Sequence, residues 1–277
     1  MKFERVYFPG ENPAECYMDC YLSDPIKNLT RKAMLVIPGG GYGSVCSERE
    51  GEPVAQAFVP YGYQAFVLHY YVGKKEPFPI QLIQVSKAIK YIKDHAEEMG
   101  LDPEQVFVSG FSAGGHLAAS AGILWHHPAI AEAVDMPYGY NKPRGVVLVY
   151  PVISTVPPFG HLGTAKNLLA TAEPTEEQLL SVSLEKQVDE RSVPAFLVHS
   201  SDDEVVDVRN SLALGAAYRE AGLCFEMHIY PSAAHGWALG NRVTSKGRKD
   251  YEGASMSEWV RLAAVWAEQL SGGDASF

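Results

Sequence analysis

Residues 105–124, QVFVSGFSAGGHLAASAGIL, carry the most specific structural pattern in this chain. Residues 105–109 are mostly apolar and predict a strand, and the small, apolar residues 113–124 predict a helix. Between them lies Gly110-Phe111-Ser112-Ala113-Gly114, a G-x-S-x-G motif at a strand-to-helix junction. So tight a turn admits only small residues around its serine, a demand that the glycines at 110, 114 and 115 meet, and it holds the hydroxyl out above the sheet. The motif therefore predicts that Ser112 is a nucleophile.

Strand and helix patterns alternate on both sides of this motif. Helices are expected at 52–61, 81–99, 113–124, 208–221 and 256–270, and strands at 33–37, 64–71, 105–109, 145–150, 195–199 and 224–230. This alternation predicts a mostly parallel central sheet with helices on both faces. Two extended stretches, 5–8 and 15–22, come first and are expected to form a β-meander with 33–37, which gives the sheet an antiparallel edge. Residues 1–277 are thus expected to form a single doubly wound α/β domain.

Residues 154–193 interrupt the alternation. The segment is rich in proline and polar residues, with short helical patterns at 165–170 and 175–188. It follows the carboxyl end of a predicted strand, where open α/β sheets bind their ligands. It is therefore interpreted as a small cap insertion over the site, with a surface excursion unrelated to substrate as the alternative.

Composition excludes several classes of partner. The 277 residues carry a formal net charge of −10 and no run of lysine and arginine, which argues against nucleic acid. No apolar run approaches the roughly 20 residues that span a bilayer, so no membrane segment is expected. The first residues, MKFERVYFPGENP, lack the apolar core of a secretory signal, which makes the cytoplasm the expected location. Four scattered cysteines show no metal-binding spacing, and no cofactor is predicted.

A serine nucleophile needs a histidine to accept its proton and an acid to orient that histidine. In this kind of fold the chain order is serine, acid, histidine. Near the C-terminus, His235 lies in a loop just after a late predicted strand, and it is the candidate base. The acid is expected in Asp202-Asp203-Glu204, at the end of the strand 195–199. Asp203 is preferred and Asp202 is the alternative.

Two backbone N–H groups are also needed to hold the negatively charged oxygen of the reaction intermediate. The residue after the nucleophile, Ala113, supplies one of them. The second is expected from the glycine run that follows the strand 33–37, at Gly40 or Gly41. The glycine run lacks the spacing of a phosphate-binding loop.

These motifs together resemble the α/β-hydrolase esterase/lipase family, which includes bacterial acetyl-xylan-esterase-like and feruloyl-esterase-like proteins. Pro38-Gly39-Gly40-Gly41 resembles the family's HGGG motif with proline in place of histidine, and His199 matches the histidine of a His-Gly-x-x-Asp-x-x-Val pattern, which places the acid at Asp203. Ser200 and Asp207 depart from that pattern without removing a catalytic atom. Further similar segments are 49–55, 62–66 and 150–153. The resemblance implies hydrolysis of short-chain esters, such as acetyl groups on oligosaccharides, through an acyl-enzyme and without a cofactor.

The substrate pocket is the least determined part of the site. Residues just past the glycine run, and one aromatic residue near the candidate base, are candidates to line it: Tyr42, Glu48, Arg49, Glu50 and Trp237. A solvated loop and a packed aromatic wall are the alternatives. The expected partner is a small ester, and the alternatives in function are a generic short-chain carboxylesterase or lipase, a peptidase, and a non-catalytic binding protein. The oligomeric state stays open.

Overall fold

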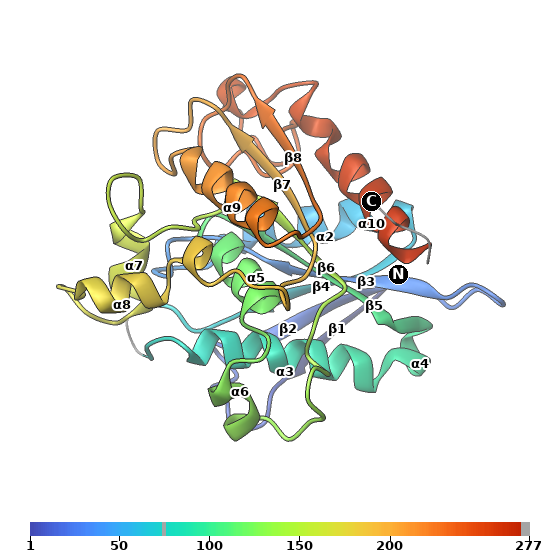
Figure 1. Cartoon of the computed structure of the whole chain (residues 1–277). Helices are drawn as coiled ribbons and strands as arrows, with labels where there is room; N and C mark the ends of the chain where they lie inside the picture. The colour runs from blue at the N-terminus through green and yellow to red at the C-terminus, as the bar shows by residue number, and fades with distance from the viewer. Residues whose placement is uncertain (74–75, 273–277) are drawn as a thin grey trace.

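One sheet of eight strands runs through the computed structural model, which describes residues 1–73 and 76–272 (Figure 1). Its spatial order is β1-β2-β4-β3-β5-β6-β7-β8. From β4 to β8 all neighbouring strands are parallel, as the alternating pattern predicts. The strands are β1 (Lys2–Tyr7), β2 (Tyr17–Leu22), β3 (Arg31–Ile37), β4 (Tyr63–His69), β5 (Leu101–Phe111), β6 (Gly145–Val149), β7 (Ala195–Ser200) and β8 (Phe225–Tyr230).

The antiparallel edge is confirmed, but the expected three-stranded meander is wrong. β1 pairs antiparallel with β2, and β2 pairs antiparallel with β4 rather than with β3. β3 lies between β4 and β5 and is parallel to both. Parallel neighbours need a crossover connection, and the helices α1 (Ser47–Glu50) and α2 (Glu52–Phe58) form it between β3 and β4.

Helices cover both faces of the sheet and enclose two hydrophobic cores (Figure 1). One core packs beneath α3 (Ile80–Asp94), α4 (Ala96–Met99), α5 (Ala113–Ile123), α6 (Pro128–Ala133) and α9 (Arg209–Glu220). The face of α3 that the apolar spacing predicts, Leu82, Val85, Ile89 and Ile92, is buried there. The other core packs beneath α2 and α10 (Trp259–Ser271). This arrangement confirms the doubly wound α/β-hydrolase fold.

The segment 154–193 contains α7 (Leu162–Leu168), α8 (Glu176–Ser181) and the 3₁₀ turn η2 (Leu184–Lys186). α8 begins with a capping box, in which Thr175 and Gln178 exchange hydrogen bonds. α7 and α8 lie together at one side of the molecule in Figure 1. A hydrogen bond from Asn167 Nδ2 to the Gly41 carbonyl oxygen, 2.8 Å long, joins α7 to the loop that follows β3.

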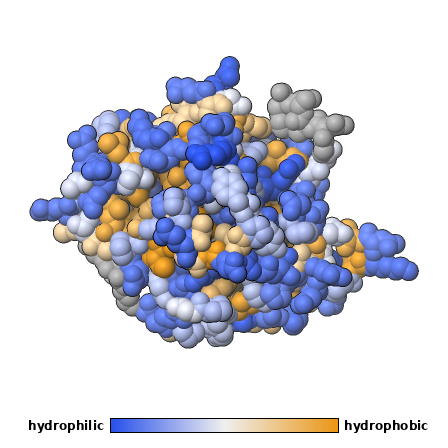
Figure 2. All heavy atoms as spheres, turned by 60° about the horizontal axis from the view of Figure 1, so that its bottom comes forward, coloured by the Kyte–Doolittle hydropathy of each residue, from blue (hydrophilic) through white to orange (hydrophobic). Residues whose placement is uncertain are grey.

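The surface is polar on the side that Figure 2 shows, where hydrophilic residues dominate and apolar side chains appear in separate patches. Across residues 1–73 and 76–272, no helix is both long and apolar enough to cross a membrane.

Candidate active site

Ser112 lies in the sharp turn between β5 and α5. Its backbone has φ 53° and ψ −118°, a region that side chains with a Cβ rarely adopt. Two glycines make the turn possible, because a Cβ at Gly110 would come within 2.1 Å of the Gly114 carbonyl oxygen and one at Gly114 within 2.2 Å of the Ile37 carbonyl oxygen. The hydroxyl is therefore held at the carboxyl edge of the sheet, above the first turn of α5.

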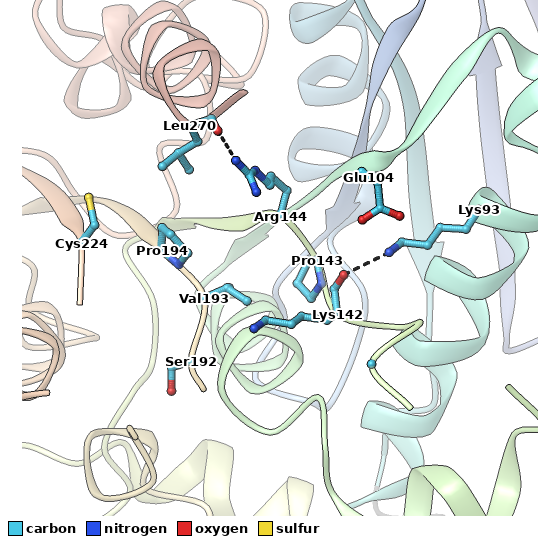
Figure 3. Close-up of a pocket in the computed structure, with 11 residues that line it drawn as sticks. Lys93, Glu104, Lys142, Pro143, Arg144, Ser192, Val193, Pro194, Cys224 and Leu270 are labelled. Atoms are coloured by element: carbon cyan, nitrogen blue, oxygen red, sulfur yellow. Dashed lines mark hydrogen bonds between the residues drawn. The ribbon is translucent and has the colours of Figure 1, made fainter. Parts of the chain in front are cut away.

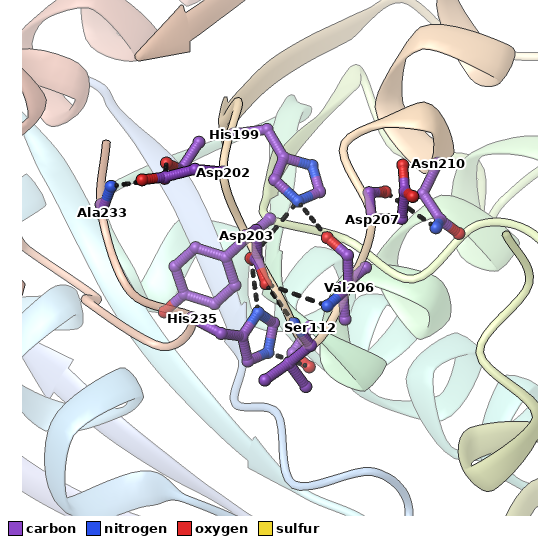
Figure 4. Close-up of polar contacts among 12 residues, drawn as sticks. Ser112, His199, Asp202, Asp203, Val206, Asp207, Asn210, Ala233 and His235 are labelled. Carbon is purple, nitrogen blue, oxygen red and sulfur yellow. Dashed lines mark hydrogen bonds and ion pairs between the residues drawn. The ribbon is translucent and has the colours of Figure 1, made fainter. Parts of the chain in front are cut away.

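His235 lies in the loop after β8 and reaches Ser112 across the edge of the sheet. Its Nε2 is 2.9 Å from Ser112 Oγ and its Nδ1 is 2.7 Å from Asp203 Oδ2 (Figure 4). An ionised carboxylate only accepts hydrogen bonds, so Nδ1 must carry the proton and Nε2 is left free to accept one from the serine. The structure thus brings together the three residues expected to form the triad.

Asp203 lies just past the end of β7, with only 8% of its surface exposed. Its Oδ1 accepts hydrogen bonds from the amides of Val205 and Val206, both 2.9 Å long. Burial by itself raises the pKa of this carboxyl, but hydrogen bonds from His199 and His235 outweigh it and hold the pKa well below its usual range. Asp203 is therefore an anion at neutral pH. Asp202, the alternative acid, instead accepts hydrogen bonds from Ser200 Oγ and from the Ala233 amide, at the start of the histidine loop.

His199 is a second histidine at the same aspartate, and in the sequence it served only to match the family pattern that locates Asp203. It is fully buried, and its Nε2 lies 2.9 Å from the Val206 carbonyl oxygen and 3.4 Å from Asp203 Oδ2. The carbonyl can only accept, so Nε2 carries the proton and Nδ1 accepts from Ser211 Oγ, at 2.7 Å. Asp203 Oδ2 is thus held between two histidines, as Figure 4 shows.

The loop after β3 presents two free amides toward the same edge. The Gly39 carbonyl accepts from the Cys46 amide and the Gly40 carbonyl from the amides of Gly43 and Ser44. The Gly39 carbonyl shares a peptide bond with the Gly40 amide, and the Gly40 carbonyl with the Gly41 amide. Because N–H and C=O point in opposite directions across a trans peptide bond, the N–H groups of Gly40 and Gly41 point away from residues 43–46. Within the described part of the chain, neither amide donates to a protein acceptor.

Gly39 brings this loop against the nucleophile. A Cβ at Gly39 would lie 2.6 Å from the Phe111 carbonyl oxygen and 3.0 Å from Ser112 Cβ. Its own amide is occupied, since it donates to Glu50 Oε2 over 2.8 Å. Ala113, the other expected donor, is the first residue of α5, where helix amides have no intrahelical acceptor. The candidate oxyanion donors Gly40, Gly41 and Ala113 therefore all keep an N–H available.

Three of the five expected pocket residues are buried in the protein. Tyr42, Glu50 and Trp237 are buried, with exposures of 1%, 1% and 0%, so they support the site from within the protein. His116 Nε2 lies 2.8 Å from the Val182 carbonyl oxygen, which can only accept, so His116 Nδ1 accepts from the Tyr42 hydroxyl at 3.0 Å. Polar residues beside a glycine run usually face solvent, whereas Tyr42 and Glu50 are hydrogen-bonded to partners distant in sequence.

The other two pocket candidates keep some exposure. The side chain of Glu48 is 57% exposed and pairs with Lys246 at 2.7 Å. The side chain of Arg49 is 18% exposed and lies against Gly236 in the histidine loop, where a Cβ would come within 3.0 Å of its Nη2. Arg49 therefore packs against the residue that directly follows His235.

A cavity of about 520 Å³ opens at the opposite edge of the sheet (Figure 3). Arg144, Pro194 and Cys224, which line it, immediately precede β6, β7 and β8 and so mark the amino ends of the strands. No triad residue lines it. Among the residues that the structure describes, no group of three or more His, Cys, Asp or Glu side chains is arranged to hold a metal ion.

Comparisons with known proteins find a matching family and several relatives. Residues 18–218 match the BD-FAE family. The chain is 35% identical over 222 residues to endo-1,4-beta-xylanase B of Butyrivibrio fibrisolvens, which covers 77% of this chain and 34% of that protein. It is 28% identical over 226 residues to an acetylxylan esterase of Xylanibacter ruminicola, which covers 80% of this chain and 44% of that protein. The chain thus spans between a third and a half of the length of these two relatives.

Solved structures match over nearly the whole chain. An acetyl ester-xyloside bifunctional hydrolase from Caldicellulosiruptor lactoaceticus superimposes with a TM-score of 0.78 and 32% identity, and the match covers 95% of this chain and 92% of that one. A carboxylesterase from Lactobacillus plantarum superimposes with a TM-score of 0.83 and 25% identity over 98% of both chains. The match of residues 18–218, together with the sheet and the serine turn, shows that the chain belongs to the BD-FAE family of α/β hydrolases.

Proposed function

We propose that the chain is a serine carboxylesterase that hydrolyses short-chain acyl esters through an acyl-enzyme. The observation that carries this proposal is the position of His235, which lies within hydrogen-bond distance of both Ser112 and Asp203, at 2.9 and 2.7 Å. A serine hydroxyl is a weak nucleophile until a base accepts its proton, and this geometry supplies that base in the required tautomer.

In the first half-reaction Ser112 Oγ attacks the ester carbonyl carbon while its proton moves to His235 Nε2. Asp203 stays ionised and stabilises the imidazolium that forms. The amides of Ala113 and of Gly40 or Gly41 hold the oxyanion, and removal of one such donor from a serine hydrolase costs about 3–4 kcal/mol. His235 then returns the proton to the departing alcohol oxygen.

In the second half-reaction water takes the place of the alcohol. His235 accepts a proton from the water, whose oxygen attacks the acyl carbon, and the acid leaves as Ser112 regains its proton.

The whole chain acts as one domain in this scheme, with the segment 154–193 as its cap. The hydrogen bond of Asn167 to the Gly41 carbonyl supports the cap, because it joins α7 to the oxyanion loop.

We further propose that the natural esters are acetyl groups on oligosaccharides. The support is the similarity to an acetylxylan esterase and to an acetyl ester-xyloside hydrolase, the second of which matches over nearly its whole length. The alternative is a general short-chain carboxylesterase, which the likeness to the Lactobacillus enzyme favours.

The first test measures acetate release from acetylated xylo-oligosaccharides beside hydrolysis of p-nitrophenyl esters from acetate to octanoate, with Ser112→Ala as the blank. We expect acetate release and a preference for the shortest ester, both abolished in the variant. Activity on p-nitrophenyl acetate alone would favour the general carboxylesterase. Hydrolysis that persists in Ser112→Ala, or failure of a phosphonate to label Ser112, would refute the serine mechanism.

A further inference from the structure

A buried carboxylate lies directly behind the oxyanion loop. Glu50 is 1% exposed, and its two oxygens contact different parts of the site. Oε2 accepts from the Gly39 amide at 2.8 Å, and Oε1 accepts from the Tyr150 hydroxyl at 3.0 Å. The Pro38 carbonyl, on the same peptide unit as the Gly39 amide, accepts from the Tyr70 hydroxyl at 2.7 Å. This peptide is therefore fixed at both of its polar atoms.

Tyr150 extends the contact to the histidine loop. It directly follows β6 with a φ of 37°, which turns its side chain across the carboxyl edge of the sheet. Its hydroxyl accepts from the Ala238 amide at 2.9 Å, and its ring meets the His235 ring edge-on with centroids 5.0 Å apart. A continuous path of hydrogen bonds thus runs from Gly39 through Glu50 and Tyr150 to Ala238.

The carboxylate is retained at a cost to stability. Burial raises the pKa of Glu50, and the favourable effects of Arg49, the Gly39 amide, Tyr150 and His235 do not fully offset it. Arg49 Nη2 is 3.3 Å from Glu50 Oε1, which partly compensates the charge. A buried charge is by itself weak evidence for a role in stability, so a role in the site has to be considered for Glu50.

We propose that Glu50 is a positioning residue that aligns the oxyanion loop with the histidine loop. With the Gly39 peptide fixed, the amides of Gly40 and Gly41 that follow it point toward the substrate. The hydrogen bond to Tyr150 fixes the position of the loop that carries His235 relative to the oxyanion loop. This inference rests on the proposed esterase function. It assigns Glu50 a part in catalysis without contact to substrate.

The test compares Glu50→Gln with the matched control Glu52→Gln, an exposed glutamate two residues along whose side chain contacts Gln56. For each protein, kcat and KM for p-nitrophenyl acetate are measured per active site titrated with a phosphonate, and Tm is measured at pH 7. In Glu50→Gln we expect kcat to fall about tenfold, less than the 10²–10³ lost when an oxyanion donor is removed, with KM within about twofold. Glu52→Gln should match the wild type.

The Tm separates positioning from a structural role. The folded-state pKa of Glu50 is raised, so ionising this carboxyl opposes folding, and a loss of Tm in Glu50→Gln is the mark of a structural role that positioning does not require. A fall in Tm together with a smaller titrated fraction and an unchanged kcat per site would overturn the proposal. If Glu50→Gln keeps full kcat while Ser112→Ala has none, the esterase proposal stands and the positioning role fails.

A double variant gives an independent check. Tyr150→Phe breaks the same path at its other end, because it removes the hydroxyl that joins Glu50 to Ala238. If the two residues act as one link, Glu50→Gln with Tyr150→Phe should lose little more than the larger of the two single losses. Losses that multiply would show that the residues act separately and would overturn the link.

Discussion

At the scale of single residues, the site depends on where its negative charge is held. Asp203 is almost completely buried and keeps its charge because backbone amides and two histidines surround it. Each contact that favours the ionised form also fixes the direction of Oδ2 toward His235. Stabilising the anion and orienting the base are therefore one arrangement.

Asp203→Asn tests this arrangement. An asparagine amide pointing at His235 would favour the tautomer with its proton on Nε2, which cannot accept from Ser112. We expect kcat to fall about 10⁴-fold with KM little changed, as for the corresponding substitution in other triads. Asp202→Asn is the control, because its side-chain oxygen can still accept from Ser200 and Ala233. A larger loss in Asp202→Asn would make Asp202 the acid.

The same substitution has a consequence for acid stability. The folded-state pKa of Asp203 is lowered, so the carboxylate contributes stability above its unfolded pKa, about 3.9, and the contribution is lost as pH falls toward the folded value. Urea unfolding should show Asp203→Asn less stable than wild type at pH 7, with a smaller difference near pH 3. An equal difference at both pH values would mean that the charge contributes nothing.

At the scale of secondary-structure elements, the sequence predicted most of what local patterns determine. Apolar periodicity located the strands and the longer helices within a few residues but missed the short helices α1 and α6. The serine turn could be located because its steric demands appear as glycines. The place of β3 could not be predicted, because strand order depends on pairing between distant segments. Glu50 was expected to face substrate, and its burial could not be predicted because its partner Tyr150 lies 100 residues along the chain. His199 had no predicted role, because its contact with Asp203 depends on how the loop after β7 folds back on the strand.

The contact between α7 and the oxyanion loop leads to a prediction at this scale. Asn167 Nδ2 donates to the Gly41 carbonyl at 2.8 Å, which steadies the loop from the side of the proposed cap. In Asn167→Ala we expect kcat/KM for p-nitrophenyl acetate to fall about three- to tenfold, the equivalent of about 1 kcal/mol for one hydrogen bond. Glu177→Ala, at an exposed position of α8, is the control. Equal kcat/KM in the wild type, Asn167→Ala and Glu177→Ala would show that the oxyanion loop keeps its conformation without the hydrogen bond from α7.

At the scale of the whole molecule, the two cores and the active site have separate roles. The sheet is packed on one face by α3, α5 and α9 and on the other by α2 and α10. The triad lies at the carboxyl edge, on turns that follow β5, β7 and β8. Parallel strands gather these turns at one edge, so the cores need only hold the strands in register for the site to assemble.

Trp266 of α10 tests this separation of roles. It is 1% exposed, its ring lies 6.2 Å from that of Phe107 and 5.8 Å from that of Phe196, and a Cβ at Gly145 would come within 2.8 Å of it. Trp266→Ala should lower the free energy of unfolding by about 3–5 kcal/mol, measured by urea unfolding, because it leaves a cavity against central strands. Val265→Ala, at a 46% exposed position of the same helix, should change it by less than about 0.5 kcal/mol. Well below the unfolding midpoint, kcat per titrated site in Trp266→Ala should stay within about twofold of wild type, since packing on this face acts through stability alone. A large loss of kcat in fully folded Trp266→Ala would mean instead that α10 shapes the site directly, and that the histidine loop responds to the packing of the core.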